Sequence, residues 1–219
     1  MKISIRNFPA TVLCVLVLGG SLTACAPIIL GGAAVGALVA TDRRTSGAQL
    51  EDEGIELRAA GRIRESLGGR VHVNVTSYNR QVLVTGEVPN AQDKQLVEQI
   101  VSRVENVRSI VNELALLGIT TLTQRSSDVL TTGKIKAAMV DARDLYSNAF
   151  KVVTERGTTY LMGLVTQREA TRATDIARGS GGVLKVVRLF EIISEAELQR
   201  TLPLPQSAPA SAPSAAPKT

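Results

Sequence analysis

An internal repeat runs through the middle of this chain, with a helix, two strands, a second helix and a final strand occurring twice in the same order. Residues 84–88 match residues 161–165, and residues 61–67 match residues 133–139. Self-similarity of this kind predicts two copies of one supersecondary unit. Because one such unit is small for an independent hydrophobic core, we expect the two copies to pack against each other.

Hydrophobic spacing predicts the first elements of each copy. In the first copy Ile63 and Leu67 recur at helical spacing, and the alternating residues Val71, Val73 and Val75 then predict a strand. The turns at residues 78–80 and 155–157 lead to a second strand in each copy. The residues that indicate the helix and the strand in the second copy are Ile135, Met139, Phe150 and Val152.

A glycine, Gly86 or Gly163, stands at the end of each second strand and suggests a close backbone approach or a bulge. The following helix begins with a capping pattern, in which Thr166 precedes Glu169 by three residues and Asn90 forms a looser version. The last strands are expected over residues 107–116 and 183–193. These elements predict an α+β fold of two tandem αββαβ domains, residues 55–117 and 126–194, each a three-stranded sheet packed on two helices.

The N-terminus has the layout of a secretory signal, with a basic head, an apolar stretch and then Cys25 directly after Leu22, Thr23 and Ala24. This run resembles the lipobox of bacterial lipoproteins, which implies removal of residues 1–24 and acylation of Cys25. An uncleaved apolar anchor is the alternative, but the apolar run is shorter than the ~20 residues of a spanning helix. By analogy with lipoproteins, Ala26 is compatible with transport to the outer membrane.

The segments that flank the repeat are predicted to lie outside the folded domains. Residues 25–54 are expected to form the lipid anchor and a Gly/Ala-rich linker. Within them, residues 26–40 either rest in the membrane interface or form a flexible apolar tether. Residues 202–219 are rich in Pro, Ala and Ser with almost no charge, so we expect a disordered tail.

Composition argues against several kinds of site. His72 is the only histidine, and alternation predicts a solvent-facing strand residue rather than a metal ligand or a general base. Because Cys25 would be acylated and Cys14 removed, we expect no metal site, no cofactor and no catalytic constellation. Removal of residues 1–24 lowers the net charge from +5 to +3, and the chain has no Trp. Nucleic acid is therefore not an expected partner.

The repeat also supports a family resemblance. Residues 82–88 (VLVTGEV) and 160–165 (YLMGLV), each followed by a capped helix and a Val-rich strand, look like the strands of paired BON domains. With the lipobox, residues 42–47 (DRRTSG) and residues 56–58, the chain resembles the dual-BON outer-membrane lipoproteins of the DolP type. The resemblance implies a lipid-anchored protein on the periplasmic face of the outer membrane, which binds anionic phospholipid through the second domain and supports envelope integrity.

Carried over to this chain, the resemblance places the lipid contact at the start of the second domain. The residues concerned are Val129, Leu130, Thr131, Lys134 and Lys136. A leucine at acyl-chain depth beside a lysine at headgroup level suits an anionic interface. The alternative is that Leu130 packs against the first domain while the lysines form a solvated face. A different function, that of a protein-interaction adaptor in outer-membrane protein assembly or cell-wall amidase regulation, also stays open.

Overall fold

The computed structural model describes residues 42–201, which form two αββαβ domains and a short C-terminal helix. Cys25, the Gly/Ala-rich segment before residue 42 and the tail 202–219 lie outside the described residues. The α+β class and the order of elements are confirmed. The first domain contains α3 (Ser46–Leu67), β1 (His72–Tyr78), β2 (Gln81–Val88), α4 (Ala91–Ser102), β3 (Ser109–Asn112) and β4 (Ala115–Leu116). The second contains α5 (Leu122–Asp141), β5 (Phe150–Glu155), β6 (Thr158–Val165), α6 (Gln167–Gly179) and β7 (Lys185–Ile192).

Short helical segments complete the described chain. One-turn helices η1 (Gly68–Arg70) and η2 (Ser147–Ala149) precede β1 and β5, and α7 (Glu195–Thr201) follows β7. The sequence patterns did not indicate α7. None of the helices within residues 42–201 is both long and apolar enough to cross a membrane.

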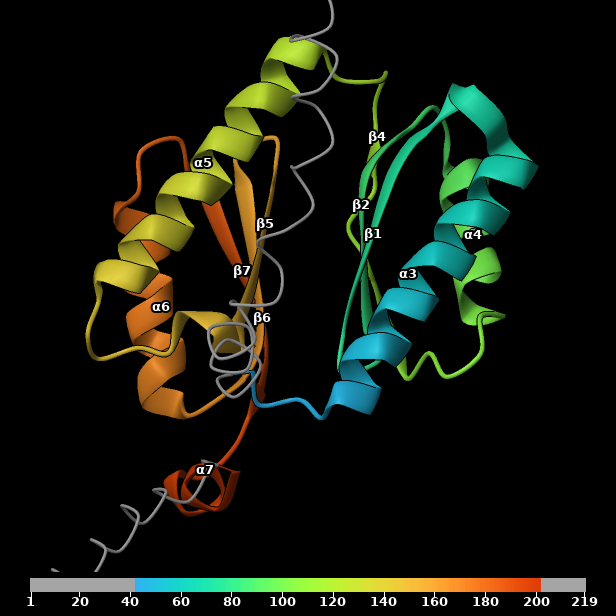
Figure 1. The fold of residues 1–219 in the computed structure, drawn as a ribbon. Helices are drawn as coiled ribbons and strands as arrows, with labels where there is room; N and C mark the ends of the chain where they lie inside the picture. The colour runs from blue at the N-terminus through green and yellow to red at the C-terminus, as the bar shows by residue number, and fades with distance from the viewer. Residues whose placement is uncertain (1–41, 202–219) are drawn as a thin grey trace, which may run out of the picture. The chain divides into compact units, whose positions relative to one another are not determined.

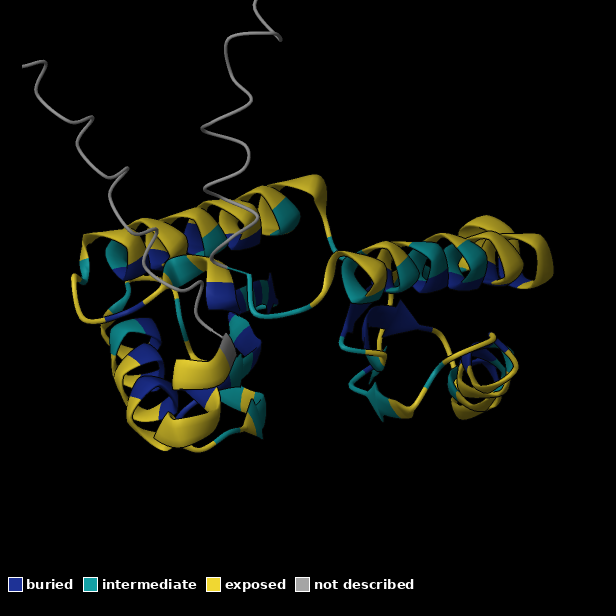
Figure 2. Cartoon of the chain, turned by 60° about the horizontal axis from the view of Figure 1, so that its bottom comes forward, coloured by how far each residue is buried: buried dark blue, intermediate teal, exposed yellow. Residues whose placement is uncertain are grey.

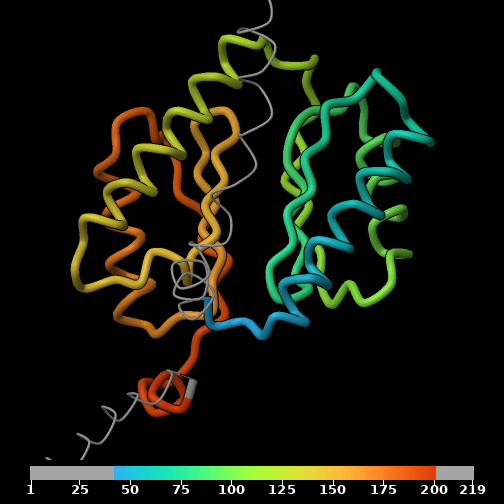
Figure 3. Tube along the Cα trace, in the orientation of Figure 1, coloured from blue at the N-terminus to red at the C-terminus, as the bar shows by residue number. Residues whose placement is uncertain are grey.

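Each sheet joins an antiparallel hairpin to a parallel third strand. β1 pairs with β2 and β5 with β6 in antiparallel register, while β3 and β7 run parallel to the central strand of their sheet. β4 also pairs with β2, so the strand predicted over residues 107–116 is interrupted between Asn112 and Ala115. Figure 1 shows α3 and α4 on one face of the first sheet and α5 and α6 on one face of the second, and Figure 3 traces the same path.

The two central strands are buried on both faces, which explains their nearly continuous apolar sequence. Val82 and Val84 of β2 face the helices of the first domain, and Leu161 of β6 faces those of the second. On the other face, side chains from both sheets form one further cluster. Its buried members are Tyr78, Leu83, Tyr160 and Met162. The prediction that the two copies pack against each other is confirmed.

A buried aspartate in the first helix of each domain holds the hairpin turn of that domain. Asn79 and Arg80 have positive φ values of 50° and 64°, as in a two-residue hairpin turn of mirror-image type. Their amides donate to the Asp52 carboxylate at 2.7 Å each. In the second domain, the amides of residues 156 and 157 donate to Asp128 at 2.8 and 2.9 Å. The carboxylate thereby stabilises a turn that is costly for Arg80, which is not a glycine.

These equivalent aspartates correct the alignment of the first helices. Asp52 and Asp128 are 76 positions apart, whereas the match of residues 61–67 with 133–139 implies 72. The structure therefore pairs Ile63 with Met139, one helical turn further along the chain. A slip of four residues preserves the apolar period of an α-helix, so the hydrophobic pattern alone does not reveal it.

The prediction of a close backbone approach at Gly86 and Gly163 is confirmed. Gly86 has φ +114°, and a Cβ atom there would lie 2.0 Å from the carbonyl oxygen of His72. A Cβ atom on Gly163 would lie 2.6 Å from the carbonyl oxygen of Ala149. Each glycine therefore lets the second strand of the hairpin approach the backbone closely where the first strand begins.

Candidate functional site

Helix α5 presents the predicted lipid-contacting residues. Thr121 caps it by accepting a hydrogen bond from the Gln124 amide at 3.2 Å. Its inner face carries Ile135 and Met139, both in the core as predicted. Most of the other residues of α5 are exposed, and Figure 2 shows exposed residues along the outer sides of the helices.

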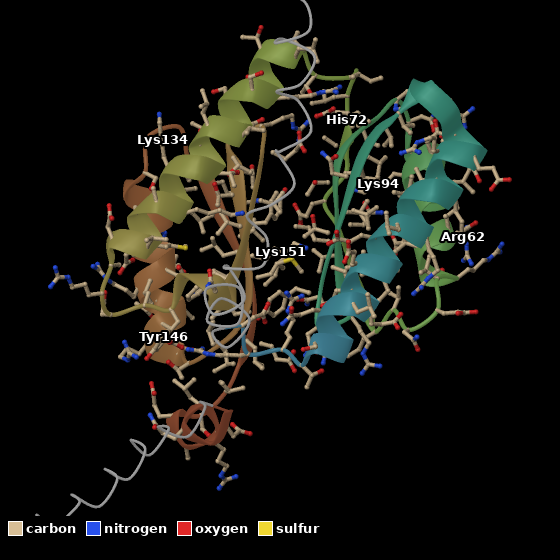
Figure 4. All side chains as sticks on the ribbon, in the orientation of Figure 1. Arg62, His72, Lys94, Lys134, Tyr146 and Lys151 are labelled. Carbon is tan, nitrogen blue, oxygen red and sulfur yellow. The ribbon has the colours of Figure 1, made fainter. Side chains whose placement is uncertain are left out.

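Four of the five predicted residues lie on this outer surface. Val129 is 70% exposed and Leu130 is 65% exposed. The alternative in which Leu130 packs against the first domain is therefore wrong. Lys134 and Lys136 are exposed as well, and Figure 4 shows Lys134 extending away from the sheet.

Thr131 is the exception, because it is buried. Only 4% of the residue is exposed, and its hydroxyl donates to the Ser127 carbonyl at 2.9 Å. The backbone of Gly182, in the loop after α6, approaches so closely that a Cβ atom there would lie 2.5 Å from Thr131 Oγ1. Thr131 therefore packs inside the second domain, and its assignment as a lipid contact is wrong.

Two further apolar residues extend the exposed surface of α5. Leu122 is 79% exposed and Val140 is 67% exposed. Leu130 and Lys134 are four residues apart and therefore neighbours on the helix surface, while Lys136 lies on the same side of the helix as Val129 but two turns further along. We call Leu122, Val129, Leu130, Lys134, Lys136 and Val140 the α5 outer face. A helical wheel of residues 122–141, drawn from the sequence, would have found Leu122 and Val140.

Polar contacts join the two domains around the shared apolar cluster. The Tyr78 hydroxyl donates to the Ala149 carbonyl at 3.2 Å and accepts from the Leu164 amide at 3.3 Å. Lys151 of β5 forms an ion pair with Glu56 of α3 at 2.6 Å. These contacts tie elements of the first domain directly to the sheet of the second.

A segment before α3 also reaches the second domain. Arg43 forms two parallel bonds to Glu169, at 2.7 and 2.8 Å, and a third to the Leu164 carbonyl at 2.9 Å. The side chains of Arg43 and Glu169 are only 4% and 0% exposed. Burial opposes ionisation of Glu169, yet bonds from Arg43 and the Thr166 amide hold its pKa below the usual range. Glu169 also completes the predicted capping box of α6 with Thr166, which is confirmed.

The neighbouring arginine binds the first domain. Arg44 forms an ion pair with Asp52 at 2.7 Å and lies 4.2 Å from the centre of the Tyr78 ring. Residues 42–44 thus join both domains, and we call them the interdomain clasp. The expectation of a linker up to residue 54 is corrected here, since Thr45 caps a helix that begins at Ser46. Within the expected linker, Arg43 and Arg44 instead pair with the buried carboxylates of Glu169 and Asp52.

His72 occupies a different environment from the one predicted. Its side chain is 17% exposed, and its Nδ1 lies 2.9 Å from Oε2 of Glu87, its register partner on β2. The second domain contributes Glu155, whose pKa is raised by burial. The prediction of a solvent-facing histidine is wrong, because the turn of the second domain covers that face of β1. Sequence reasoning missed this cluster, since its members come from three strands of two domains.

Comparison with known proteins gives matches over both domains. The BON domain family matches residues 52–118 and 127–194. The chain is 37% identical over 175 residues to the outer membrane lipoprotein DolP of Haemophilus influenzae, covering 78% of this chain and 90% of that protein. It is 29% identical over 154 residues to the 21 kDa hemolysin of Actinobacillus pleuropneumoniae, covering 69% and 79%. Among solved structures, CdsD of the Chlamydia trachomatis type III secretion system matches at 12% identity, covering 67% of this chain and 98% of that one, with a TM-score of 0.26.

Proposed function

Since the chain belongs to the BON-domain family, as a two-domain member of the DolP type, we propose that it is an outer-membrane lipoprotein that binds anionic phospholipid. In this proposal acylated Cys25 anchors the protein on the periplasmic face, and the second BON domain contacts the headgroups. Binding at that surface would support the integrity of the envelope. The name of the Haemophilus influenzae relative, an outer membrane lipoprotein, supports the location.

The observation that carries the lipid proposal is the composition of the α5 outer face. Val129 and Leu130 suit the upper acyl region, because they are apolar and mostly exposed to solvent. Lys134 and Lys136 beside them can stay at the level of the headgroup phosphates. A lysine near an anionic membrane surface contributes about 1 kcal/mol to the free energy of binding, so the site binds weakly on its own. An acyl anchor would hold the domain near the leaflet and raise its effective concentration there.

We predict that replacing Lys134 and Lys136 with Glu reduces binding to phosphatidylglycerol vesicles about tenfold or more. The reason is that two attractive charges of about 1 kcal/mol each become repulsive. The measurement is co-sedimentation of the unacylated protein, residues 41–202, with anionic and neutral vesicles at low and moderate salt. Wild-type binding should be restricted to anionic vesicles and weaken as salt is added.

A matched control lies on the other helix of the same domain. Arg172 and Arg178 of α6 are exposed, and replacing both with Glu changes the net charge by the same amount. This control should keep most of the vesicle binding. Equal loss in the two variants would mean that net charge, and not the α5 outer face, determines binding.

An adaptor role is the second candidate, favoured by an exposed apolar pair on the first domain. Leu50 and Leu57 of α3 are 71% and 69% exposed and lie seven residues apart, on the same side of the helix. Such a pair suits a protein partner in outer-membrane protein assembly or in amidase regulation. If the Lys134 and Lys136 variant binds vesicles as the wild type does, the lipid assignment fails and this surface becomes the better candidate.

A further inference from the structure

Three potential metal ligands from two domains meet at the interface. His72 stands at the start of β1, Glu87 near the end of β2, and Glu155 at the end of β5. One ligand atom from each of these side chains lies within 4.8 Å of the other two. The strand register brings His72 and Glu87 side by side, while the packing of the second sheet supplies Glu155. An ion at this position would therefore join the two domains.

The Glu87 carboxylate is incompletely satisfied. The residue is completely buried, and its Oε2 accepts from the backbone amide and the hydroxyl of Thr120, at 3.3 and 3.2 Å, besides lying next to His72. Its Oε1 has no hydrogen-bond partner among residues 42–201. The nearest cationic atom is Arg156 Nε at 3.9 Å, too far for a hydrogen bond. A buried carboxylate oxygen without a donor is costly, and a cation would relieve that cost.

Charge and space at the cluster also favour a cation. A cavity of about 370 Å³ lies beside it, with Val129 and Thr132 of α5 in its lining. Such a cavity gives room for a water ligand and a path for an ion. The carboxylates here outnumber the guanidinium groups by three to two. The carboxylates are those of Glu87, Asp128 and Glu155, and the guanidinium groups are those of Arg125 and Arg156.

We propose that His72, Glu87 and Glu155 bind a Zn²⁺ ion that ties the two BON domains together. One imidazole nitrogen and two carboxylates, with water in the fourth position, form a ligand set that Zn²⁺ accepts. Ligand atoms on one tetrahedral Zn²⁺ are about 3.4 Å apart, given bond lengths of about 2.1 Å. The His72 and Glu87 atoms are 2.9 Å apart, and Glu155, which accepts a hydrogen bond from Asn74, would reach the same ion by a small side-chain movement, since all three ligand atoms lie within 4.8 Å of one another. Nδ1 gives its lone pair to the metal, and the ring hydrogen resides on Nε2.

The single histidine makes the test direct. In the full chain labelled with ¹⁵N, Zn²⁺ should shift the imidazole Nδ1 resonance of His72, with no other histidine to confuse the assignment. Zn²⁺ at roughly 100 times its Kd should also raise the Tm by about 5–10 °C relative to EDTA, whereas Mg²⁺ should not. The Tm shift is measured within each variant, so a less stable variant still gives a valid comparison.

Two site variants and one surface variant test whether the Zn²⁺ effect comes from this cluster. His72→Asn and Glu155→Gln should each lose the Zn²⁺-dependent rise in Tm. Asp144→Asn removes an exposed carboxylate paired with Arg172 and should keep it. The proposal is overturned if the His72 resonance does not move, if the site variants respond to Zn²⁺ as the wild type does, or if Mg²⁺ alone stabilises the chain.

Discussion

Replacing Arg43 with Ala is expected to destabilise the chain by about 3–5 kcal/mol, the cost of removing one partner of a buried ion pair. Glu169 is fully buried, and Arg43 supplies both of its bidentate bonds. Without the guanidinium, the carboxylate is left to the α6 capping box alone, and the Leu164 carbonyl loses a donor as well. The measurement is the free energy of unfolding from urea denaturation of the wild type and the variant.

The effect of the ion pair on stability can be separated from the effect of removing a long side chain. The double variant Arg43→Met, Glu169→Gln removes both charges but keeps similar volumes, so we expect it to recover much of the stability lost in Arg43→Ala. Arg172→Ala is a surface control, because its pair with Asp144 is about half exposed and worth roughly 0–1 kcal/mol. A loss of less than 1 kcal/mol for Arg43→Ala would show that the interdomain clasp does not hold the domains.

The same pair predicts an acid dependence of stability. The pKa of Glu169 is lower in the folded protein than the ~4.3 of an unfolded glutamate. A depressed carboxyl pKa contributes stability that is fully present above the unfolded value and is lost as the pH falls through the folded value. We therefore expect the free energy of unfolding to fall more steeply below about pH 4.3 in the wild type than in the Arg43→Met, Glu169→Gln variant. Parallel curves would contradict this assignment.

Features that depend on nearby residues could be predicted from the sequence. The two-residue hairpin turns, the Thr166–Glu169 capping box and the close approach at Gly86 each follow from residue types within one short segment. The exposure of Val129 and Leu130 also fits local helical periodicity. The burial of Thr131 could not be predicted in this way, because the loop around Gly182 that covers it belongs to another part of the chain.

Contacts between distant residues could not be predicted in this way. Arg43 and Glu169 are 126 positions apart, and a run of polar residues before a helix indicates a loop whether or not its charges find buried partners. His72 lies near a second carboxylate, that of Glu155, only because the two sheets pack against each other. A single sequence carries the hydrophobic pattern that makes such sheets pack, but not the choice of which charged groups meet between them.

Replacing Gly86 with Ala is expected to destabilise the chain by about 4 kcal/mol or more, placing it among the most damaging single substitutions. A Cβ atom at this position would lie 2.0 Å from the His72 carbonyl oxygen, and backbone atoms cannot yield as a flexible side chain can. The positive φ of 114° adds a strain that alanine does not tolerate. Relief would require β1 to separate from β2, which would break the pairing of His72 with Glu87. Urea denaturation and the yield of folded protein measure the effect.

The matched control is Gly133→Ala, the same chemical change at a glycine inside helix α5. Within the part of the chain that the structure describes, no atom outside the local helix backbone lies within 4 Å of a Cβ added there. Alanine should therefore stabilise the helix by about 0.5–1 kcal/mol, because it lowers the backbone entropy lost on folding. Opposite signs for the two substitutions would show that the first is a steric effect at the hairpin. If Gly86→Ala costs less than 1 kcal/mol, the backbones of β1 and β2 are not as close as the structure has them.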